Sequence, residues 1–199
     1  YRTMLERGEE LLIGTSILMK AVSVERAVIG VENNKPDAIK HLSKLAKEYK
    51  GIEIKALKTM YPQGGEKQLI AAVTGREVPA PPALPIDVGA VVQNVGTAFA
   101  IYEAVMKNKP LIERVITVTG KKVSSPSNLL ARLGTPFQQL IDGCGGVPES
   151  TGKIVGGGPM MGKALLNLDV PMTKGSSGLL FIDRAEAKRA EESPCIRCA

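Results

Sequence analysis

Two cysteines near the end of the chain have the spacing of a metal-binding pair. Cys195 and Cys198 form a CxxC motif, which brings two thiolates within reach of one metal ion or one cluster iron. A tetrahedral zinc site or a cubane cluster needs four ligands, and the other candidates, Cys144 and His41, lie far upstream. The spacing leaves zinc and iron–sulfur binding open. We expect the missing ligands to follow Ala199 in a longer protein, as in a bacterial ferredoxin-type run.

A glycine-rich segment at residues 61–68 is the first candidate nucleotide site. Gly64 and Gly65 would let backbone N–H groups approach an anion at the start of a predicted helix. Glu66 and Lys67 would then face that ligand. An ordinary strand-to-helix turn with charged first-turn residues explains the same pattern, and the residues alone favour this simpler interpretation.

Amide and hydroxyl side chains form a second candidate site. Gln93, Asn94 and Thr97 lie at the end of a predicted strand over 91–95. At the carboxyl end of a parallel strand, such groups would lie in the crevice where α/β sheets bind ligands. Capping of the next helix by Asn94 or Thr97 explains them equally well.

A GxxxxGK motif at residues 157–163 resembles the start of a phosphate-binding loop. Ala164 stands where a magnesium-binding hydroxyl is needed, so we reject a nucleotide triphosphatase. A tight glycine turn between strands is predicted instead, with Met160 and Met161 as a candidate partner contact. His41 is expected to face solvent from a helix, and Cys144 to be a small packed thiol.

The elements that must position these groups begin with a βαβ unit. An amphipathic helix before residue 22 leads to a strand over 27–32, a helix from Pro36 and a strand over 52–57. This order with short connections implies a parallel sheet covered by helices. Further predicted elements are a helix over 68–73, an extended proline-rich loop over 76–89, the strand over 91–95 and a helix ending near Asn108.

After Pro110 the pattern changes to that of a small α+β module. β-branched residues over 114–119, followed by a turn at 120–123, predict a β-hairpin. The remaining predicted elements are a short helix over 137–141, strands over 153–155 and 178–182, and a charged, helix-compatible stretch over 183–192.

Composition limits the classes of function. The net charge is +6, but the lysines and arginines are scattered and there is no tryptophan, so no nucleic-acid partner is expected. No apolar run reaches the roughly 18 residues that a membrane-spanning helix requires, so any membrane association is expected through partner subunits. Three cysteines do not form a disulfide framework, which favours a reducing compartment.

Several motifs together resemble the C subunit of the Rnf ion-translocating electron-transport complex, and they occur in that family's order. More distantly, the chain is similar to the flavin- and NADH-binding subunit of respiratory complex I. The motifs that carry the resemblance are Asn34-Lys35-Pro36, the glycine-rich run at 61–70, Val92-Gln93-Asn94-Val95-Gly96-Thr97, Glu113-Arg114-Val115, Gly157-Gly158-Pro159-Met160-Met161-Gly162 and Pro194-Cys195-Ile196-Arg197-Cys198.

The resemblance implies a fold class and a domain organisation. The expected fold is α/β: a partial Rossmann-like parallel sheet with helices, then a small α+β β-grasp domain and the start of a ferredoxin-like helical segment. Residues 1–110 resemble the C-terminal part of a flavin/NADH-binding domain. Residues 111–182 resemble a β-grasp, or soluble-ligand-binding, domain, and residues 183–199 resemble the truncated start of an iron–sulfur domain.

The resemblance also implies cofactors and partners. The intact protein is expected to exchange electrons between NADH, FMN and two four-iron four-sulfur clusters, one of them ligated by Cys195 and Cys198. Its partners are expected to be the other subunits of a ferredoxin:NAD oxidoreductase complex coupled to ion movement, at the cytoplasmic face of the plasma membrane. A non-catalytic docking subunit of the same kind of complex is the alternative.

Site residues follow from the resemblance position by position. Gly65 and Glu66 match a Gly-Glu pair at the nucleotide site of the complex I subunit, and Asn94 and Thr97 match its flavin-side turn. Lys67 replaces a second glutamate, which changes the charge beside the nicotinamide site. Gln93 replaces an asparagine. The glycine-rich flavin loop would precede Tyr1, so this piece alone is expected to bind flavin weakly or not at all and to be inactive.

Overall fold

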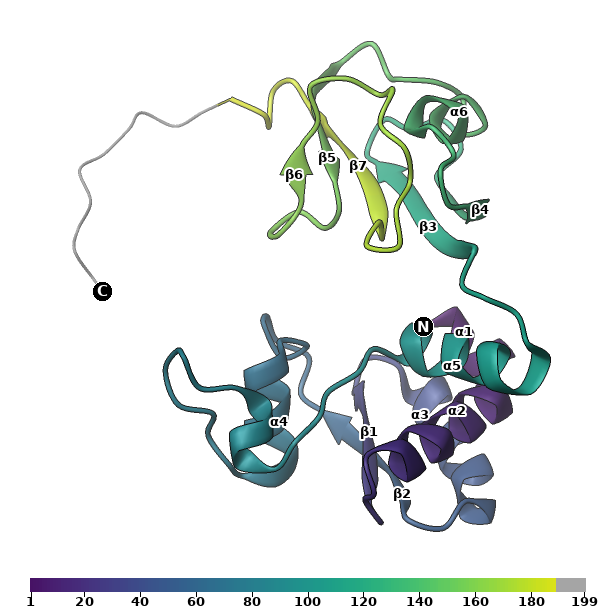
Figure 1. Cartoon of the computed structure of the whole chain (residues 1–199). Helices are drawn as coiled ribbons and strands as arrows, with labels where there is room; N and C mark the ends of the chain where they lie inside the picture. The colour runs from purple at the N-terminus through teal and green to yellow at the C-terminus, as the bar shows by residue number, and fades with distance from the viewer. Residues whose placement is uncertain (189–199) are drawn as a thin grey trace. The chain divides into compact units, whose positions relative to one another are not determined.

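A computed structural model of the chain describes residues 1–188 and divides at Pro110 into two units, Tyr1–Pro110 and Leu111–Ala199 (Figure 1). Cys195 and Cys198 lie outside the described residues, as does the end of the predicted helix over 183–192. Within its described part, residues 184–186 form a turn after the last strand. No helix within residues 1–188 has the length and apolar character needed to cross a membrane.

The first unit is built around two parallel strands joined by a helix. β1 (Ala27–Glu32) pairs with β2 (Ile52–Leu57) in continuous register from one end to the other. α3 (Pro36–Leu45), extended by the short helix η1 (Ala46–Glu48), makes the crossover. Pro36 occupies the first turn, where its missing N–H costs no hydrogen bond. The predicted βαβ unit is confirmed.

Three helices complete the core of this unit: α1 (Arg2–Glu6), α2 (Gly8–Ala21) and α5 (Val95–Lys107). A Cβ atom on Gly14 of α2 would lie 1.9 Å from the carbonyl oxygen of Ala98 in α5, so only glycine allows this close helix contact. The buried residues that form the core are Met4, Leu11, Leu12, Ile29, Val31, Ala38, Leu42, Ile52 and Ala98.

The predicted strand over 91–95 is wrong. Residues 90–94 run without regular secondary structure, and α5 begins at Val95. A strand needs a neighbour to complete its ladder of hydrogen bonds, and the parallel sheet within residues 1–188 contains only β1 and β2. The β-branched residues of this stretch favour a strand, but Val91 is 52% exposed and is therefore not buried in a sheet.

The second unit is a five-stranded mixed sheet with one helix. The strands are β3 (Glu113–Gly120), β4 (Ser127–Arg132), β5 (Thr151–Gly156), β6 (Lys163–Ala164) and β7 (Gly178–Asp183), in the order β4-β3-β7-β5-β6. β3 and β7 run parallel at the centre, and the other pairs are antiparallel (Figure 1). The sequence prediction of a parallel α/β unit followed by a small α+β module is confirmed.

The core of this unit lies between the sheet and α6 (Phe137–Asp142). Ile116 and Val118 of β3 are fully buried there, while the alternate residues of the strand are exposed. Cys144 is fully buried in the same cluster, which confirms that it is a packed thiol. The remaining members are Val123, Ala131, Phe137, Leu140, Ile141, Met172, Leu179 and Phe181.

Two smaller predictions have different outcomes. The glycine motif at 157–163 forms the turn between β5 and β6, and it leaves Met160 and Met161 68% and 84% exposed, as expected. His41 does not simply face solvent. It is half-buried, because its imidazole packs against Gly8 of α2. A Cβ atom on Gly8 would lie only 3.0 Å from the Nε2 atom of His41.

Candidate functional site

The loops that follow β1 and β2 are tied together at the carboxyl ends of these strands. The Oδ1 atom of Asn33 accepts hydrogen bonds from the backbone N–H of Thr59 at 3.2 Å and from its hydroxyl at 2.8 Å. The Asn33 N–H donates to the Leu57 carbonyl at 2.8 Å. Ligands bind at this edge of α/β sheets. Sequence reasoning missed both side chains, although their positions directly after the strands place them at this edge.

A charged pair lies at the same edge. Lys35 donates to the carboxylate of Glu32, the last residue of β1, and also to Oδ1 of Asn34 at 3.1 Å. The Lys35 side chain is therefore held close to the strand end. Because Glu32 balances its charge, the pair adds polar groups but no net charge to the edge of the sheet.

The glycine turn lies in the loop between β2 and α4 (Glu66–Thr74), which is the loop that also contains Thr59. The N–H of Gln63 donates to the Met60 carbonyl at 2.8 Å, and the N–H of Gly65 donates to the Pro62 carbonyl at 2.7 Å, so the turn is closed by its own backbone. Gly65 is the N-cap of α4. A Cβ atom there would lie 3.0 Å from the Pro62 carbonyl oxygen and 2.5 Å from Oε1 of Gln68, so a side chain at this position would crowd the turn.

Gly64 differs from Gly65 because it faces open space. A Cβ atom at Gly64 would meet no protein atom within 4 Å. Gly64 is exposed, so this side of the turn is open to solvent. The first N–H groups of α4 have no partner within the helix and carry its positive dipole end. The turn can therefore present backbone donors to a bound group without displacing protein atoms.

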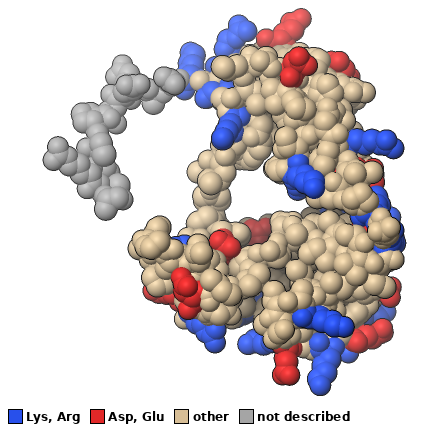
Figure 2. Space-filling model, viewed as in Figure 1, with Lys and Arg blue, Asp and Glu red and all other residues tan. Residues whose placement is uncertain are grey.

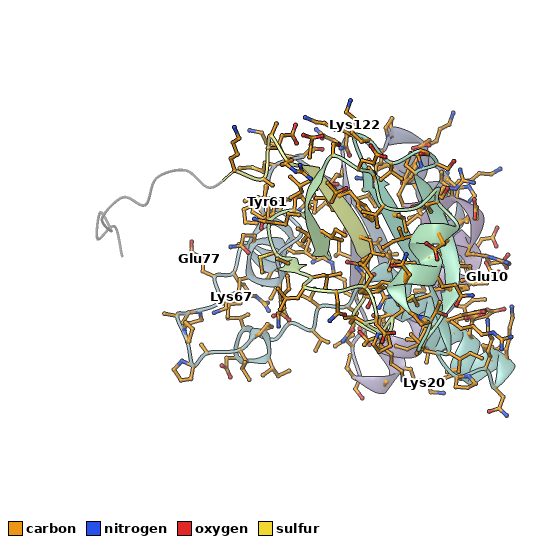
Figure 3. All side chains as sticks on the ribbon, turned by 90° about the horizontal axis from the view of Figure 1, so that it is seen from above. Glu10, Lys20, Tyr61, Lys67, Glu77 and Lys122 are labelled. Atoms are coloured by element: carbon orange, nitrogen blue, oxygen red, sulfur yellow. The ribbon has the colours of Figure 1, made fainter. Side chains whose placement is uncertain are left out.

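Glu66 and Lys67, in the first turn of α4, have different roles. Glu66 is exposed and forms no ion pair with another described residue, so its carboxylate is free to accept hydrogen bonds. The ammonium of Lys67 donates to the carbonyl oxygen of Pro79 at 2.8 Å. Lys67 therefore holds a loop. Figure 3 shows Tyr61 and Lys67 on the same side of the first unit as Glu77, which belongs to that loop.

The proline-rich loop over 76–89 is fastened at several points. Besides Lys67, Arg76 donates from Nη1 to the Val88 carbonyl at 2.9 Å. The N–H of Leu84 donates to the Asp87 carboxylate at 2.8 Å and starts the short helix η2 (Pro85–Val88). These bonds and the prolines restrict the backbone beside the glycine turn.

The second candidate segment caps α5. Asn94 accepts a hydrogen bond from the Gly96 N–H at 2.8 Å through Oδ1, and its carbonyl accepts from the Thr97 N–H at 2.9 Å. The capping interpretation of Asn94 is thus confirmed, while its amide nitrogen stays available. Gln93 and Thr97 are exposed. No hydrogen bond or ion pair between described residues joins this segment to the glycine turn.

Metal binding is not located within the described residues. No cluster of three or more His, Cys, Asp or Glu side chains within residues 1–188 could hold a metal ion. The CxxC pair lies beyond that range, so the structure does not describe its geometry.

Each of the two units contains a segment that matches a known protein family. Residues 1–103 match the Nuo51 FMN-binding domain family, and residues 115–164 match the SLBB domain family.

Curated relatives match over the whole chain. The C subunit of the proton-translocating ferredoxin:NAD(+) oxidoreductase complex of Clostridium ljungdahlii is 50% identical over 198 residues, which are 100% of this chain and 43% of the relative. The C subunit of the Na(+)-translocating complex of Acetobacterium woodii is 46% identical, over 100% of this chain and 44% of the relative. The C subunit of the ion-translocating oxidoreductase complex of Rhodobacter capsulatus is 40% identical, over 99% and 38%. The chain thus spans less than half the length of these relatives.

Solved structures share the fold. Crystal structures of an NAD+-reducing NiFe hydrogenase superpose with a TM-score of 0.72 in the air-oxidised state and 0.74 in the H2-reduced state. The sequence identities are 20% and 18%, and each alignment covers 92% of this chain and 37% of the other.

Proposed function

We propose, since this chain belongs to the Nuo51 FMN-binding domain family, that it is part of an electron-transfer subunit of a membrane-associated ferredoxin:NAD oxidoreductase complex coupled to ion translocation. In this proposal electrons pass between NADH, FMN and two four-iron four-sulfur clusters. Residues 1–110 contribute the C-terminal part of the flavin/NADH-binding domain. Residues 111–182 form a β-grasp module, and residues 183–199 begin an iron–sulfur domain.

The observation that carries the proposal is the open glycine turn at Gly64. The turn starts α4, follows a strand of a parallel sheet, and lies within the residues that match the flavin-binding family. Nucleotide cofactors bind at such places because the backbone can approach them closely and the helix start offers free N–H groups.

The residues around the turn fit a nucleotide. A bound flavin would accept a hydride from NADH and release electrons one at a time. The backbone at Gly64 and Gly65 would contact the nucleotide, and the exposed Glu66 carboxylate would accept hydrogen bonds from ribose hydroxyls. Gln93, Asn94 and Thr97 would supply amide and hydroxyl groups from the start of α5. Lys67 would act indirectly, since its ammonium holds the loop at Pro79.

The iron–sulfur part of the proposal is tested on the full-length protein. Reconstitution with iron and sulfide, followed by reduction, is expected to give the EPR signals of two four-iron clusters. Replacing Cys195 and Cys198 with serine is expected to remove or alter one signal, because thiolates are the cluster ligands. The Cys144→Ser variant is the matched control and should leave the signals unchanged. An unchanged spectrum in the double variant would reject these ligands.

A docking subunit without redox chemistry is the second candidate, and one observation favours it. Met160 and Met161 are largely exposed in the turn between β5 and β6, and Leu166 nearby is fully exposed. Where such exposed apolar groups form a contiguous patch, they are typical of a protein contact. Flavin fluorescence of the full-length protein during NADH titration separates the two functions, because a docking subunit would show no spectral change.

A further inference from the structure

The outer side of α3 carries a row of lysines that the proposed electron transfer does not use. Lys40, Lys44 and Lys47 follow one another at steps of four and three residues, so they project from the same side of the helix. All three side chains are exposed. None of them forms an ion pair with another residue of the described range, so all three ammonium groups are free to pair with a partner.

The lysines line a shallow groove of about 610 Å³. At a rise of about 1.5 Å per residue the row is about 10 Å long, which matches a short peptide segment better than a small anion. The groove is lined by Asp37, Lys40, His41, Ser43, Lys44 and Lys47.

Asp37 marks one end of the row. Its carboxylate accepts a hydrogen bond from the Tyr1 hydroxyl, and this bond holds the pKa of Asp37 below its usual value. The aspartate therefore remains anionic across the neutral range. A negatively charged ligand would be repelled at this end and attracted along the lysines, so the groove has a polarity.

Two simpler roles for the lysines are insufficient. Basic side chains stabilise the last turn of a helix, which accounts for Lys44 in α3 and Lys47 in η1 but not for Lys40 in the middle of α3. A membrane surface would require apolar side chains beside the lysines. The exposed large apolar residues of the described range include none between Val24 and Met60, so no large apolar side chain is exposed beside the lysines.

We propose that Lys40, Lys44 and Lys47 form a docking face for an acidic segment of a partner protein. The attraction arises from charge complementarity along the row, and the groove accepts the side chains of the segment. Such contacts act over about 10 Å at moderate ionic strength and weaken as salt is added. The face lies on the helix that crosses between β1 and β2, so docking would occur on the flavin/NADH unit.

Zero-length carbodiimide cross-linking of the intact complex tests the proposal, because it joins a lysine to a carboxylate only where the two form an ion pair. Intersubunit cross-links identified by mass spectrometry are expected at Lys40, Lys44 and Lys47. Lys20, Lys122 and Lys174 are internal references, since they are also exposed and form no ion pair within residues 1–188. Cross-links that are no more frequent on α3 than at the references would overturn the proposal.

A binding measurement on the full-length subunit provides the second arm. The probe is a fluorescent eight-residue oligoglutamate, measured by anisotropy at low salt. The K40Q/K44Q/K47Q variant is expected to bind at least tenfold more weakly than the wild type, and the K20Q/K122Q/K174Q variant, with the same net charge, less than twofold more weakly. Equal losses in both variants would show that only net charge matters. Lysine-dependent binding to anionic phosphatidylserine vesicles without binding to the peptide would assign the face to a membrane. Either result rejects the proposal.

Discussion

At the scale of single residues, the candidate site residues divide into those that form a structural hydrogen bond and those that do not. Lys67 holds a loop through the Pro79 carbonyl, and Asn94 caps α5 through Gly96, so both have a structural bond in addition to any contact with a cofactor. Glu66 and Gly64 have no such bond within the described residues. The variants that best report ligand binding are therefore those at Gly64 and Glu66, whereas those at Lys67 and Asn94 need controls for structure.

Asn94 allows its two roles to be separated. Asn94→Ala removes the cap and is expected to lower the free energy of unfolding by about 1 kcal/mol, whereas Asn94→Ser keeps a capping oxygen and most of that stability. Thermal unfolding measures this difference. If the amide also contacts flavin, Asn94→Ser should still weaken flavin binding, as measured by fluorescence titration. Full flavin affinity in Asn94→Ser would leave Asn94 with the capping role alone.

Lys67 is expected to control the mobility of the proline-rich loop. Lys67→Met removes the hydrogen bond to Pro79, which is worth about 0.5–1.5 kcal/mol, so tryptic cleavage after Arg76 should become about 2- to 10-fold faster. Lys58→Met is the control, because Lys58 is exposed and forms no side-chain hydrogen bond with a described residue. Equal cleavage rates in the wild type and Lys67→Met would show that the hydrogen bond from Lys67 to Pro79 does not restrain the loop.

Asp183 is expected to make the stability of the second unit depend on pH. A hydrogen bond from Ser150, together with one from the Ala185 N–H at 3.0 Å, holds the pKa of Asp183 below its usual value. The stability that this provides is complete above the carboxyl pKa of the unfolded chain and is lost as the pH falls through the lower folded pKa. Ser150→Ala should therefore lower the urea midpoint at neutral pH, with a difference that vanishes in strong acid. Ser177→Ala is the control, and a difference that persists in acid would contradict this explanation.

At the scale of elements, the close contact of α2 and α5 depends on one glycine. Gly14→Ala gains about 1 kcal/mol of helix propensity but forces a Cβ atom onto the Ala98 carbonyl, and such overpacking costs about 1–3 kcal/mol or more. The variant should unfold at a lower temperature. Gly8→Ala, in the same helix, meets only the flexible ends of Leu45 and His41 and should be affected less. Equal unfolding temperatures for the two variants would contradict the packing described for α2.

The sequence predicted the elements whose signals are local. β1, α3 and β2 follow from periodicity and from Pro36, and the hairpin of β3 and β4 follows from its β-branched residues. The strand predicted over 91–95 failed because strand formation depends on a neighbouring strand, which a local pattern does not contain. The bond between Asn33 and Thr59 was missed for a related reason, since it joins loops that are distant in sequence.

At the scale of the whole chain, the local distribution of charged residues is informative, whereas the net charge is not. Lysines and arginines alternate with acidic residues over the face shown in Figure 2, which agrees with the scattered pattern in the sequence. The row on α3 is a local departure from that mixture, and it becomes visible only when the helix and its ion pairs are known. Net charge alone would not have identified it.

Reduction of flavin by NADH tests most directly whether the open face of the glycine turn receives a nucleotide. In the full-length, flavin-loaded protein, stopped-flow absorbance should show bleaching of the flavin when NADH is added. Gly64→Val fills space that no protein atom occupies, so the fold should be kept while the apparent affinity for NADH falls about tenfold or more. Gly158→Val, which also faces open space, should behave as the wild type. Absence of bleaching in the wild type, or unchanged NADH dependence in Gly64→Val, would contradict the claim.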